Sequence, residues 1–521
     1  MKKFKGFLKL ACILMAIAML FSACGGSKAA PAKQADDKQA ETNAAAESTM
    51  PAETEKIVFA SVGWGEQARD QEAVTNKLKE ISRDRINVEA DITIIGISTY
   101  GQQINVMMAG GEALDLFFLP FGTSVNSMIS QNQLMPLNDL LASEGQAITE
   151  SLGDLIQYGQ FKGETYAVPF NGSKVYPAAI AMREDLLQKY NLNLDDVKSY
   201  KDLAKIYDVI KQNEPEMVCI APNNSNLLSS YAMGDKIDKI DMMGDNIGVL
   251  LGNDSLKLVN LYETEEYKDL VYTLRDWYNK GYILKDAATT TESGSVMYNE
   301  GKVFSYFYVD VLDSIDKAYH HPGLTQQGQQ TIVKALNNPV ISSSVGFYST
   351  GINSQSKHPE AAMKWFNLMY KDAEAVNTLY WGVEGKNFVK EDDGTISFTP
   401  EEAESRGYDL PFNWMFGNTE LQYAFKDSGQ SADYFAQRVK QNDTAELSKA
   451  FGFSFDITPV QAQYTAVSNV MDQYQRALES GSVDPAVELP NFIKKLKDAG
   501  VEEVIAEKQI QLDKWAAENN K

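Results

Sequence analysis

The first folded part of the chain alternates short apolar runs with stretches of helical periodicity. Residues 57–62, 88–95 and 114–119 are rich in β-branched or large apolar side chains, and the two segments between them repeat apolar residues at helical spacing. This order of strand, helix, strand, helix and strand favours an α/β fold with a parallel sheet. Because ligands bind beyond the carboxyl ends of such strands, the loops at 63–66 and 120–123 are candidate site segments.

The first 23 residues are typical of a secretion signal. Four lysines precede an uncharged run over 10–21, and this run is shorter than the ~20 residues of a bilayer-spanning helix. It ends in Phe21-Ser22-Ala23-Cys24, which resembles the lipobox of bacterial lipoproteins. We therefore expect residues 1–23 to be removed and Cys24 to carry a palmitate-type lipid anchor. Cleavage as a plain secretory peptide is the alternative.

Residues 24–55 have the composition of a flexible tether. They are rich in Ala, Lys, Gln, Glu, Ser and Thr and contain no aromatic residue, so they cannot bury enough apolar area to order themselves. We expect this segment to hold a soluble body away from a membrane surface.

Charge and cysteine content exclude several classes of function. The net charge of −23 becomes −27 once the four lysines of the signal are lost, which argues against nucleic acid as a partner. Cys219 is the one remaining thiol, and its apolar surroundings in the sequence predict a core position. Residues 391–394 are acidic but lack the spacing of a calcium loop and predict a hairpin turn. We find no hydrolase, P-loop or zinc-protease motif, and expect no catalytic residue, metal or cofactor.

A series of short motifs resembles the extracellular solute-binding proteins of ABC importers (family 1, carbohydrate-type). In chain order they are QINVMMAGGE at 103–112, DLFF at 115–118, LMPLNDLL at 134–141, KGETYAVP at 162–169, MREDLL at 182–187, WYNKGYI at 277–283, NEGKV at 299–303 and HPEAAMKWF at 358–366. Each motif is short, and it is their order that is specific. From about Phe451 the chain resembles an extension of a lipoprotein-type subset of this family.

The resemblance implies an α/β, periplasmic-binding-protein-like fold of two hinge-linked lobes with a C-terminal helical extension. We expect residues 56–168 and 304–352 to form the N-terminal lobe, and residues 169–303 and 353–450 the C-terminal lobe. Residues 451–521 are expected to pack as helices on the C-terminal lobe. The protein would act as a monomer on the extracytoplasmic face of a bacterial cell membrane, with the permease subunits of an ABC transporter as partners.

A carbohydrate site needs aromatic faces against the apolar faces of the sugar, and carboxylates or amides against its hydroxyls. We expect the ligand to contact residues that follow strands or flank glycines, namely Trp64, Glu66, Phe121, Phe170, Asn171, Tyr231, Tyr306, Tyr308, Asp310, Trp381, Glu384 and Trp414. Tyr306, Tyr308 and Asp310 alternate along one strand and so share a face. For each of these residues, packing into the core or forming a turn is the alternative.

The sequence therefore predicts a binding protein, not an enzyme, that captures a carbohydrate, in particular an oligosaccharide, between two lobes and delivers it to an importer. Two alternatives stay open. The same fold could bind a peptide or another small solute, because acidic loops and aromatic walls also suit cationic peptides. A surface glycoside hydrolase is the other, because 71 acidic residues always allow a carboxylate pair. Fold resemblance does not name the ligand.

Overall fold

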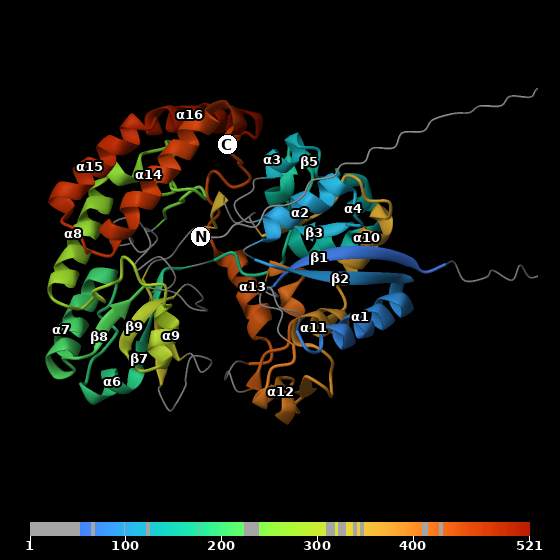
Figure 1. Ribbon diagram of the computed structural model, residues 1–521, viewed down its shortest axis with the longest axis horizontal. Helices are drawn as coiled ribbons and strands as arrows, with labels where there is room; N and C mark the ends of the chain where they lie inside the picture. The colour runs from blue at the N-terminus through green and yellow to red at the C-terminus, as the bar shows by residue number, and fades with distance from the viewer. Residues whose placement is uncertain are drawn as a thin grey trace, which may run out of the picture. The chain divides into compact units, whose positions relative to one another are not determined.

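Two five-stranded sheets organise the chain in the computed structural model (Figure 1). The structure describes residues 53–63, 68–97, 99–120, 125–175, 177–222, 239–308, 318–320, 330–336, 341–343, 348–408, 415–426 and 431–521. The predicted signal peptide, Cys24 and most of the predicted tether lie outside these residues. Within the described part, no helix combines the length and the apolar character that crossing a bilayer requires.

The first sheet has the strand order β2-β1-β3-β12-β6. Its strands are β1 (Glu55–Gly63), β2 (Val88–Gly96), β3 (Leu116–Phe118), β12 (Ser349–Ile352) and β6 (Val168–Pro169). The strands β1, β2 and β3 are parallel, as their alternation with helices predicts. The strand β12 runs antiparallel between β3 and β6, so β6 points the same way as β3. The carboxyl ends of β1, β2, β3 and β6 therefore lie at one side of the sheet, the first carboxyl edge.

The second sheet has the order β10-β11-β7-β9-β8. Its strands are β7 (Ala179–Arg183), β8 (Val218–Ala221), β9 (Val303–Tyr308), β10 (Ala318–His320) and β11 (Thr331–Ala335). The strands β8 and β9 are parallel, whereas β7 is antiparallel to both β9 and β11. Ala179, at the start of β7, is opposite Tyr308 on one side and Ala335 on the other. The ends of β8, β9 and β11 thus meet at the second carboxyl edge.

The helices of the first lobe enclose an aromatic core. They are α1 (Gln71–Ile86), α2 (Tyr100–Gly110), α3 (Val125–Ser130), α4 (Asn138–Glu144), α5 (Gln146–Leu152), α10 (Pro359–Leu368), α11 (Ala373–Trp381), α12 (Pro400–Glu404) and α13 (Tyr434–Thr444). Phe59 of β1 lies 5.3 Å from Trp365 of α10 and 4.8 Å from Phe416, measured between ring centroids.

Two small hairpins complete this part, β4–β5 (Gln160–Phe161 and Glu164–Thr165) and β13–β14 (Phe388–Lys390 and Ile396–Phe398). The second of these confirms the predicted turn at residues 391–394.

The second lobe has its own core against the other sheet. Its helices are α6 (Glu184–Lys189), α7 (Leu203–Asn213), α8 (Glu265–Asn279) and α9 (Gly294–Asn299). Tyr207 of α7 packs edge-on against Trp277 of α8, with 5.2 Å between ring centroids. Cys219 is fully buried beside them, and burial raises its pKa to about 12. The thiol is therefore an inert core residue, as predicted.

Three C-terminal helices follow, of which two, α14 and α15, pack on α8, while α16 packs on α14 and α15 (Figure 1). They are α14 (Gln461–Glu479), α15 (Pro485–Asp498) and α16 (Val501–Glu518). Phe492 of α15 lies 4.7 Å from Tyr262, centroid to centroid, within the core of the second lobe. The buried Lys508 of α16 donates to Asp245 Oδ1 at 2.8 Å and to the carbonyl oxygen of Ile247 at 2.9 Å. This extension is part of the second lobe's core rather than a separate domain.

The structure divides the middle of the chain differently from the sequence prediction. Residues 304–352 were expected in the N-terminal lobe, but β9 lies in the second sheet between β7 and β8, and only β12 joins the first. Residues 353–450 were expected in the C-terminal lobe, but α10 and α11 cover the first sheet and its helix α1. The physical reason is that an apolar strand or helix face fits either core, so sequence pattern alone does not choose between them.

The chain passes between the lobes three times: residues 445–460 lead from the end of α13 to the start of α14, and two other segments connect the sheets at their carboxyl edges. Residues 170–178 lead from the end of β6 to the start of β7, and residues 336–348 lead from the end of β11 to the start of β12. Both crossings begin and end at a carboxyl edge.

Candidate functional site

The first carboxyl edge includes the start of α1 and the end of α11. Helix α1 connects the parallel strands β1 and β2, so its N-terminus at Asp70 lies at that edge. At the far end of α1, Arg85 forms ion pairs with Asp372 (3.3 Å) and Glu374 (3.2 Å), at the start of α11. Since α11 starts beside the C-terminus of α1, its own C-terminus at Trp381 returns to the carboxyl edge.

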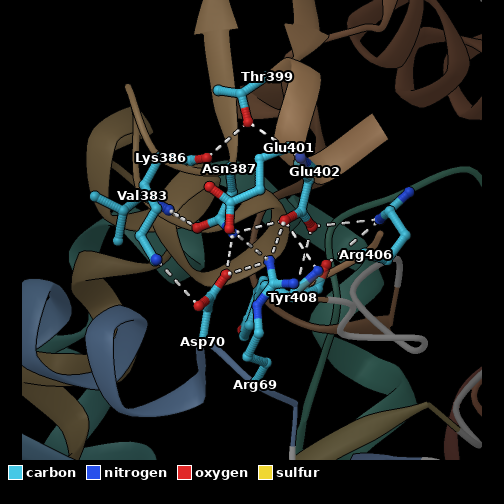
Figure 2. A network of polar contacts seen from close by, with 11 residues as sticks. Arg69, Asp70, Val383, Lys386, Asn387, Thr399, Glu401, Glu402, Arg406 and Tyr408 are labelled. Atoms are coloured by element: carbon cyan, nitrogen blue, oxygen red, sulfur yellow. Dashed lines mark hydrogen bonds and ion pairs between the residues drawn. The ribbon is translucent and has the colours of Figure 1, made fainter. Parts of the chain in front are cut away.

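A buried asparagine joins three segments at this edge (Figure 2). The side chain of Asn387 is fully buried. Its amide nitrogen donates to Asp70 Oδ2 and to Glu402 Oε2, both at 3.0 Å. Its Oδ1 accepts from the backbone N–H of Val383 at 2.9 Å. One side-chain amide thus forms hydrogen bonds with two carboxylates and with the backbone of a turn.

Glu402 fixes the loop that follows α12. Its carboxylate accepts from the backbone N–H of Gly407 at 2.9 Å and from that of Tyr408 at 3.1 Å. Gly407 in turn accepts, through its carbonyl oxygen, from the backbone N–H of Asp70 at 2.9 Å. Thr399 caps α12 by accepting from the backbone N–H of Glu402. The start of α1 and the loop after α12 are therefore tied together by backbone and by side chain.

Three cations surround the two buried carboxylates (Figure 2). Lys386 Nζ lies 3.1 Å from Asp70 Oδ1, Arg69 Nη2 lies 3.3 Å from Asp70 Oδ2, and Arg406 Nε lies 3.5 Å from Glu402 Oε1. The acidic side chains are 7% and 1% exposed, whereas the cations are 43–45% exposed. Burial by itself raises the pKa of Asp70, but hydrogen bonds from its two cations and Asn387 outweigh it and lower that pKa.

The predicted residues Trp381 and Glu384 lie next to this network. Trp381 is half-buried and packs edge-on against Phe425, with 4.8 Å between ring centroids. Its indole nitrogen is buried without a hydrogen-bond partner among the described residues. Glu384 is exposed and forms an ion pair with Lys390 at 2.9 Å. The turn between them needs Gly382, because its φ is +94° and a Cβ there would lie 2.5 Å from Asn387 Oδ1.

Asn171 is a structural residue at the first crossing. Its backbone N–H donates to the carbonyl oxygen of Gly417 at 2.8 Å, and its side-chain amide nitrogen donates to Asn418 Oδ1 at 2.9 Å. Asn442 of α13 holds the crossing further along, by donating to the carbonyl oxygen of Gly172 and accepting from the backbone N–H of Lys174. Residues 171–174 are therefore fixed to the first lobe.

Phe170 and Lys174 close a tight turn in the same crossing. Phe170 is 3% exposed. Lys174 Nζ donates to the carbonyl oxygen of Phe170 at 2.7 Å and lies 3.2 Å from the centroid of its ring. Lys174 has no carboxylate partner among the described residues, and burial brings its pKa well below the usual value. In this conformation the Phe170 ring is covered, which favours the packing alternative for this residue.

Tyr306 is also a core residue, whereas Tyr308 lies at the second carboxyl edge. Tyr306 is 1% exposed and packs edge-on against Tyr298 of α9, with 5.2 Å between ring centroids. Burial raises the pKa of Tyr306. Tyr308 is half-buried and packs edge-on against Tyr306. Helix α9 therefore covers Tyr306 through Tyr298.

Half of the predicted ligand residues lie outside the described part of the chain. These are Trp64, Glu66, Phe121, Tyr231, Asp310 and Trp414. Conversely, Asp70, Asn387, Glu402 and Lys174 were not predicted. Thr399-Pro400-Glu401-Glu402 carries the signature of a helix start, but no local pattern indicates that Glu402 is buried.

Two shallow cavities lie elsewhere, on the C-terminal extension. One, of about 720 Å³, is between α16 and residues 255–260, and the other, of about 610 Å³, is between α8 and α15. Neither is lined by residues of the carboxyl edges. We therefore place the candidate ligand site at the carboxyl edges, where strand ends and crossings meet.

Comparisons with known proteins agree with this architecture. The family model "Bacterial extracellular solute-binding protein" matches residues 64–376, and the model "Domain of unknown function (DUF3502)" matches residues 449–517. The second match coincides with the helical extension. A "Carbohydrate ABC transporter substrate-binding protein" of Streptococcus pneumoniae serotype 4 is 25% identical over 519 residues, which is 99% of each chain.

Solved structures share the fold over most of the chain. The N-glycan transport solute-binding protein NgtS of S. pneumoniae is 23% identical, with a TM-score of 0.76 over 90% of this chain and 100% of that one. The substrate-binding protein FusA of S. pneumoniae, in an EF-hand mutant form with fructo-nystose, is 16% identical, with a TM-score of 0.57 over 89% and 99%. Because the family model matches more than half of the chain and the two-lobed fold is shared, the protein belongs to the bacterial extracellular solute-binding proteins.

Proposed function

We propose that the protein captures an oligosaccharide between its two lobes and delivers it to the permease of an ABC transporter. The observation that carries this proposal is that both crossings join the sheets at their carboxyl edges. A ligand held there contacts both lobes, and the lobes can close around it by bending the crossings.

The type of ligand is supported by the relatives and by the residues at the edges. The full-length relative is named for carbohydrate transport, and NgtS has been solved with Man5GlcNAc. Trp381 and Tyr308 offer half-buried aromatic surface at the two edges, and Trp64 and Phe121 follow β1 and β3 in the sequence. Such aromatic side chains suit the apolar faces of sugars better than they suit ions.

The N-terminal region supports attachment to the cell surface. A lipid on Cys24 would anchor the chain, and residues 24–55 would tether the body on the extracytoplasmic face. We propose that the body works there as a monomer without enzymatic activity, since transfer of a ligand to a permease requires no bond to be made or broken.

Thermal shift against a ligand panel tests this function. The mature chain, residues 24–521 with Cys24→Ala, would be heated with monosaccharides, fructo-oligosaccharides, Man1GlcNAc, Man5GlcNAc and a cationic peptide. A ligand present at 100 times its Kd should stabilise the protein by ~2.7 kcal/mol, and we expect this from an oligosaccharide. Binding of the peptide alone would contradict the carbohydrate assignment, and cleavage of a glycan during the assay would contradict the absence of enzymatic activity.

A further inference from the structure

We propose that Asn387 is a positioning residue for ligand binding, because its amide sets the relative placement of the three segments that build the first carboxyl edge. This inference rests on the proposed function, since it assigns the ligand to that edge. It names a role for a side chain that does not itself touch the ligand.

The three segments come from distant parts of the sequence. Asp70 precedes α1 directly and follows the loop that leaves β1. Asn387 belongs to the turn after Trp381, and Glu402 holds the loop that ends at Tyr408. The nitrogen of Asn387 lies 3.0 Å from an oxygen of each carboxylate, so a single buried atom connects all three segments.

The electrostatics make this atom difficult to replace. Two buried carboxylates that share one neighbour repel each other unless a donor lies between them. The three surrounding cations reach in from the half-exposed surface, whereas Asn387 is wholly buried. An amide is the neutral group that donates twice to the acids while its oxygen still accepts from the turn.

The same side chain also determines where Trp381 lies. Its oxygen accepts from the backbone N–H of Val383, and its own backbone N–H donates to the carbonyl oxygen of Val383 at 2.8 Å. These two bonds close the turn from Val383 to Asn387, which starts two residues after Trp381. A displaced Asn387 would therefore displace the aromatic ring at the end of α11.

Asn387→Asp is the sharpest test because it keeps size and shape. The new carboxylate still accepts from Val383 but faces two other carboxylates, so the edge should open at neutral pH. Protonation of the cluster restores one donor. We expect affinity for the best glycan of the panel to fall at least about tenfold at pH 7.5 and to recover largely at about pH 5, with the unmodified protein measured at both values.

Asn353→Asp is the matched control. Asn353 is 3% exposed in the same lobe but at the opposite edge of the first sheet, where its amide donates to the carbonyl oxygen of Leu114 at 3.0 Å. We expect this variant to lose stability without losing affinity. If both variants lose affinity in proportion to their loss of Tm, Asn387 is merely structural and the proposal is wrong. Unchanged affinity in Asn387→Asp overturns it as well.

Amide hydrogen exchange separates this inference from the proposed function. The backbone N–H groups of Val383, Gly407 and Tyr408 bond to Asn387 or Glu402. They should exchange faster in Asn387→Asp than in the unmodified protein at pH 7.5, whether or not a ligand is present. If no glycan binds, the proposed function fails, and the exchange rates alone decide whether Asn387 fixes the edge. Unchanged exchange rates would show that Asn387 does not fix the edge and would overturn the proposal.

Discussion

At the scale of single residues, two glycines in one turn differ in how strictly their positions require glycine. Gly382 and Gly385 both have positive φ, +94° and +83°. A Cβ on Gly382 would lie 2.5 Å from Asn387 Oδ1, whereas a Cβ on Gly385 would meet nothing within 4 Å. Both positions therefore carry a conformational cost for a side chain. That cost is larger at Gly382, whose ψ of −155° lies in a region that essentially only glycine adopts, and Gly382 also lacks space for a Cβ.

Substituting each glycine by alanine should reveal that difference. Gly385→Ala should lower the free energy of unfolding by about 1–2 kcal/mol, the cost of a left-handed non-glycine residue. Gly382→Ala should cost about 2 kcal/mol more, because Asn387 must move and leave buried carboxylates without their donor. Urea unfolding gives both values. Equal losses would mean that the network tolerates a displaced Asn387.

Buried polar residues were the part of the site that was hardest to predict from the sequence. Trp381 was singled out from the glycines that follow it, and its contact with a ligand stays a prediction. Asn387, Glu402 and Lys174 were not singled out, because their burial depends on segments that are far apart in the sequence. Phe170 and Tyr306 were expected to bind ligand, yet the structure packs them against Lys174 and Tyr298. The spacing of residues along a strand shows which of them share a face, but not whether that face contacts a ligand or the core.

At the scale of elements, the local pattern was sufficient for the parallel strands of the first sheet and for one hairpin. The parallel arrangement of β1, β2 and β3 follows from the alternation of strands and helices, and the β13–β14 hairpin follows from Asp393-Gly394. Assignment of β9 and α10 to a sheet did not follow, because apolar faces of either element fit both cores. Pairing between strands that are more than 100 residues apart, such as β7 with β9, leaves no signature in a single sequence.

The contact between α14 and α8 depends on a buried carboxyl group. Glu479 is 3% exposed and accepts from Gln475 of its own helix at 2.8 Å and from Tyr267 of α8 at 3.3 Å. Burial raises its pKa from the ordinary 4.5 to about 7. Tyr262, which packs against Tyr267, also faces this group. These neighbours are neutral, so the protonated form is favoured in the folded state.

The stability of the extension should therefore fall as pH rises. Below about pH 4.5, Glu479 is protonated in both the folded and the unfolded state, and its contribution is fully present. That contribution is lost as pH rises through about 7, by roughly 3 kcal/mol in total. Urea unfolding at pH 5 and pH 8 should show this loss in the unmodified protein and not in Glu479→Gln.

Glu265→Gln provides the control on the neighbouring helix. The side chain of Glu265 is 78% exposed at the start of α8, so its removal should change the free energy of unfolding by less than about 0.5 kcal/mol at either pH. A pH dependence that persists in Glu479→Gln would place its origin in another group.

At the scale of the whole molecule, the described residues form two large apolar cores, one against each sheet. Phe59 and Trp365 belong to the first, and Tyr207 and Trp277 to the second. The helices α14, α15 and α16 share the second core, so they should unfold with it. Three segments join the two lobes, at 170–178, 336–348 and 445–460. Because each lobe has a large core of its own, we expect each lobe to unfold as a unit.

Calorimetric unfolding should accordingly show two transitions in the absence of ligand. Leu78 of α1 and Leu270 of α8 are buried in the first and the second core respectively. Replacement of either leucine by alanine should cost about 2–5 kcal/mol and lower only the transition of its own lobe. If either variant lowers both transitions equally, the lobes form one cooperative unit.

The same two transitions locate the ligand. A sugar captured between the lobes binds the native form of both, so saturating ligand should raise both transitions and bring them together, because loss of either lobe releases it. A ligand bound to one lobe stabilises that lobe alone and raises a single transition. Calorimetry with the best glycan of the panel, repeated on Leu78→Ala and Leu270→Ala, therefore distinguishes capture between the carboxyl edges from binding at the surface of one lobe. A rise confined to one transition would contradict the proposed function.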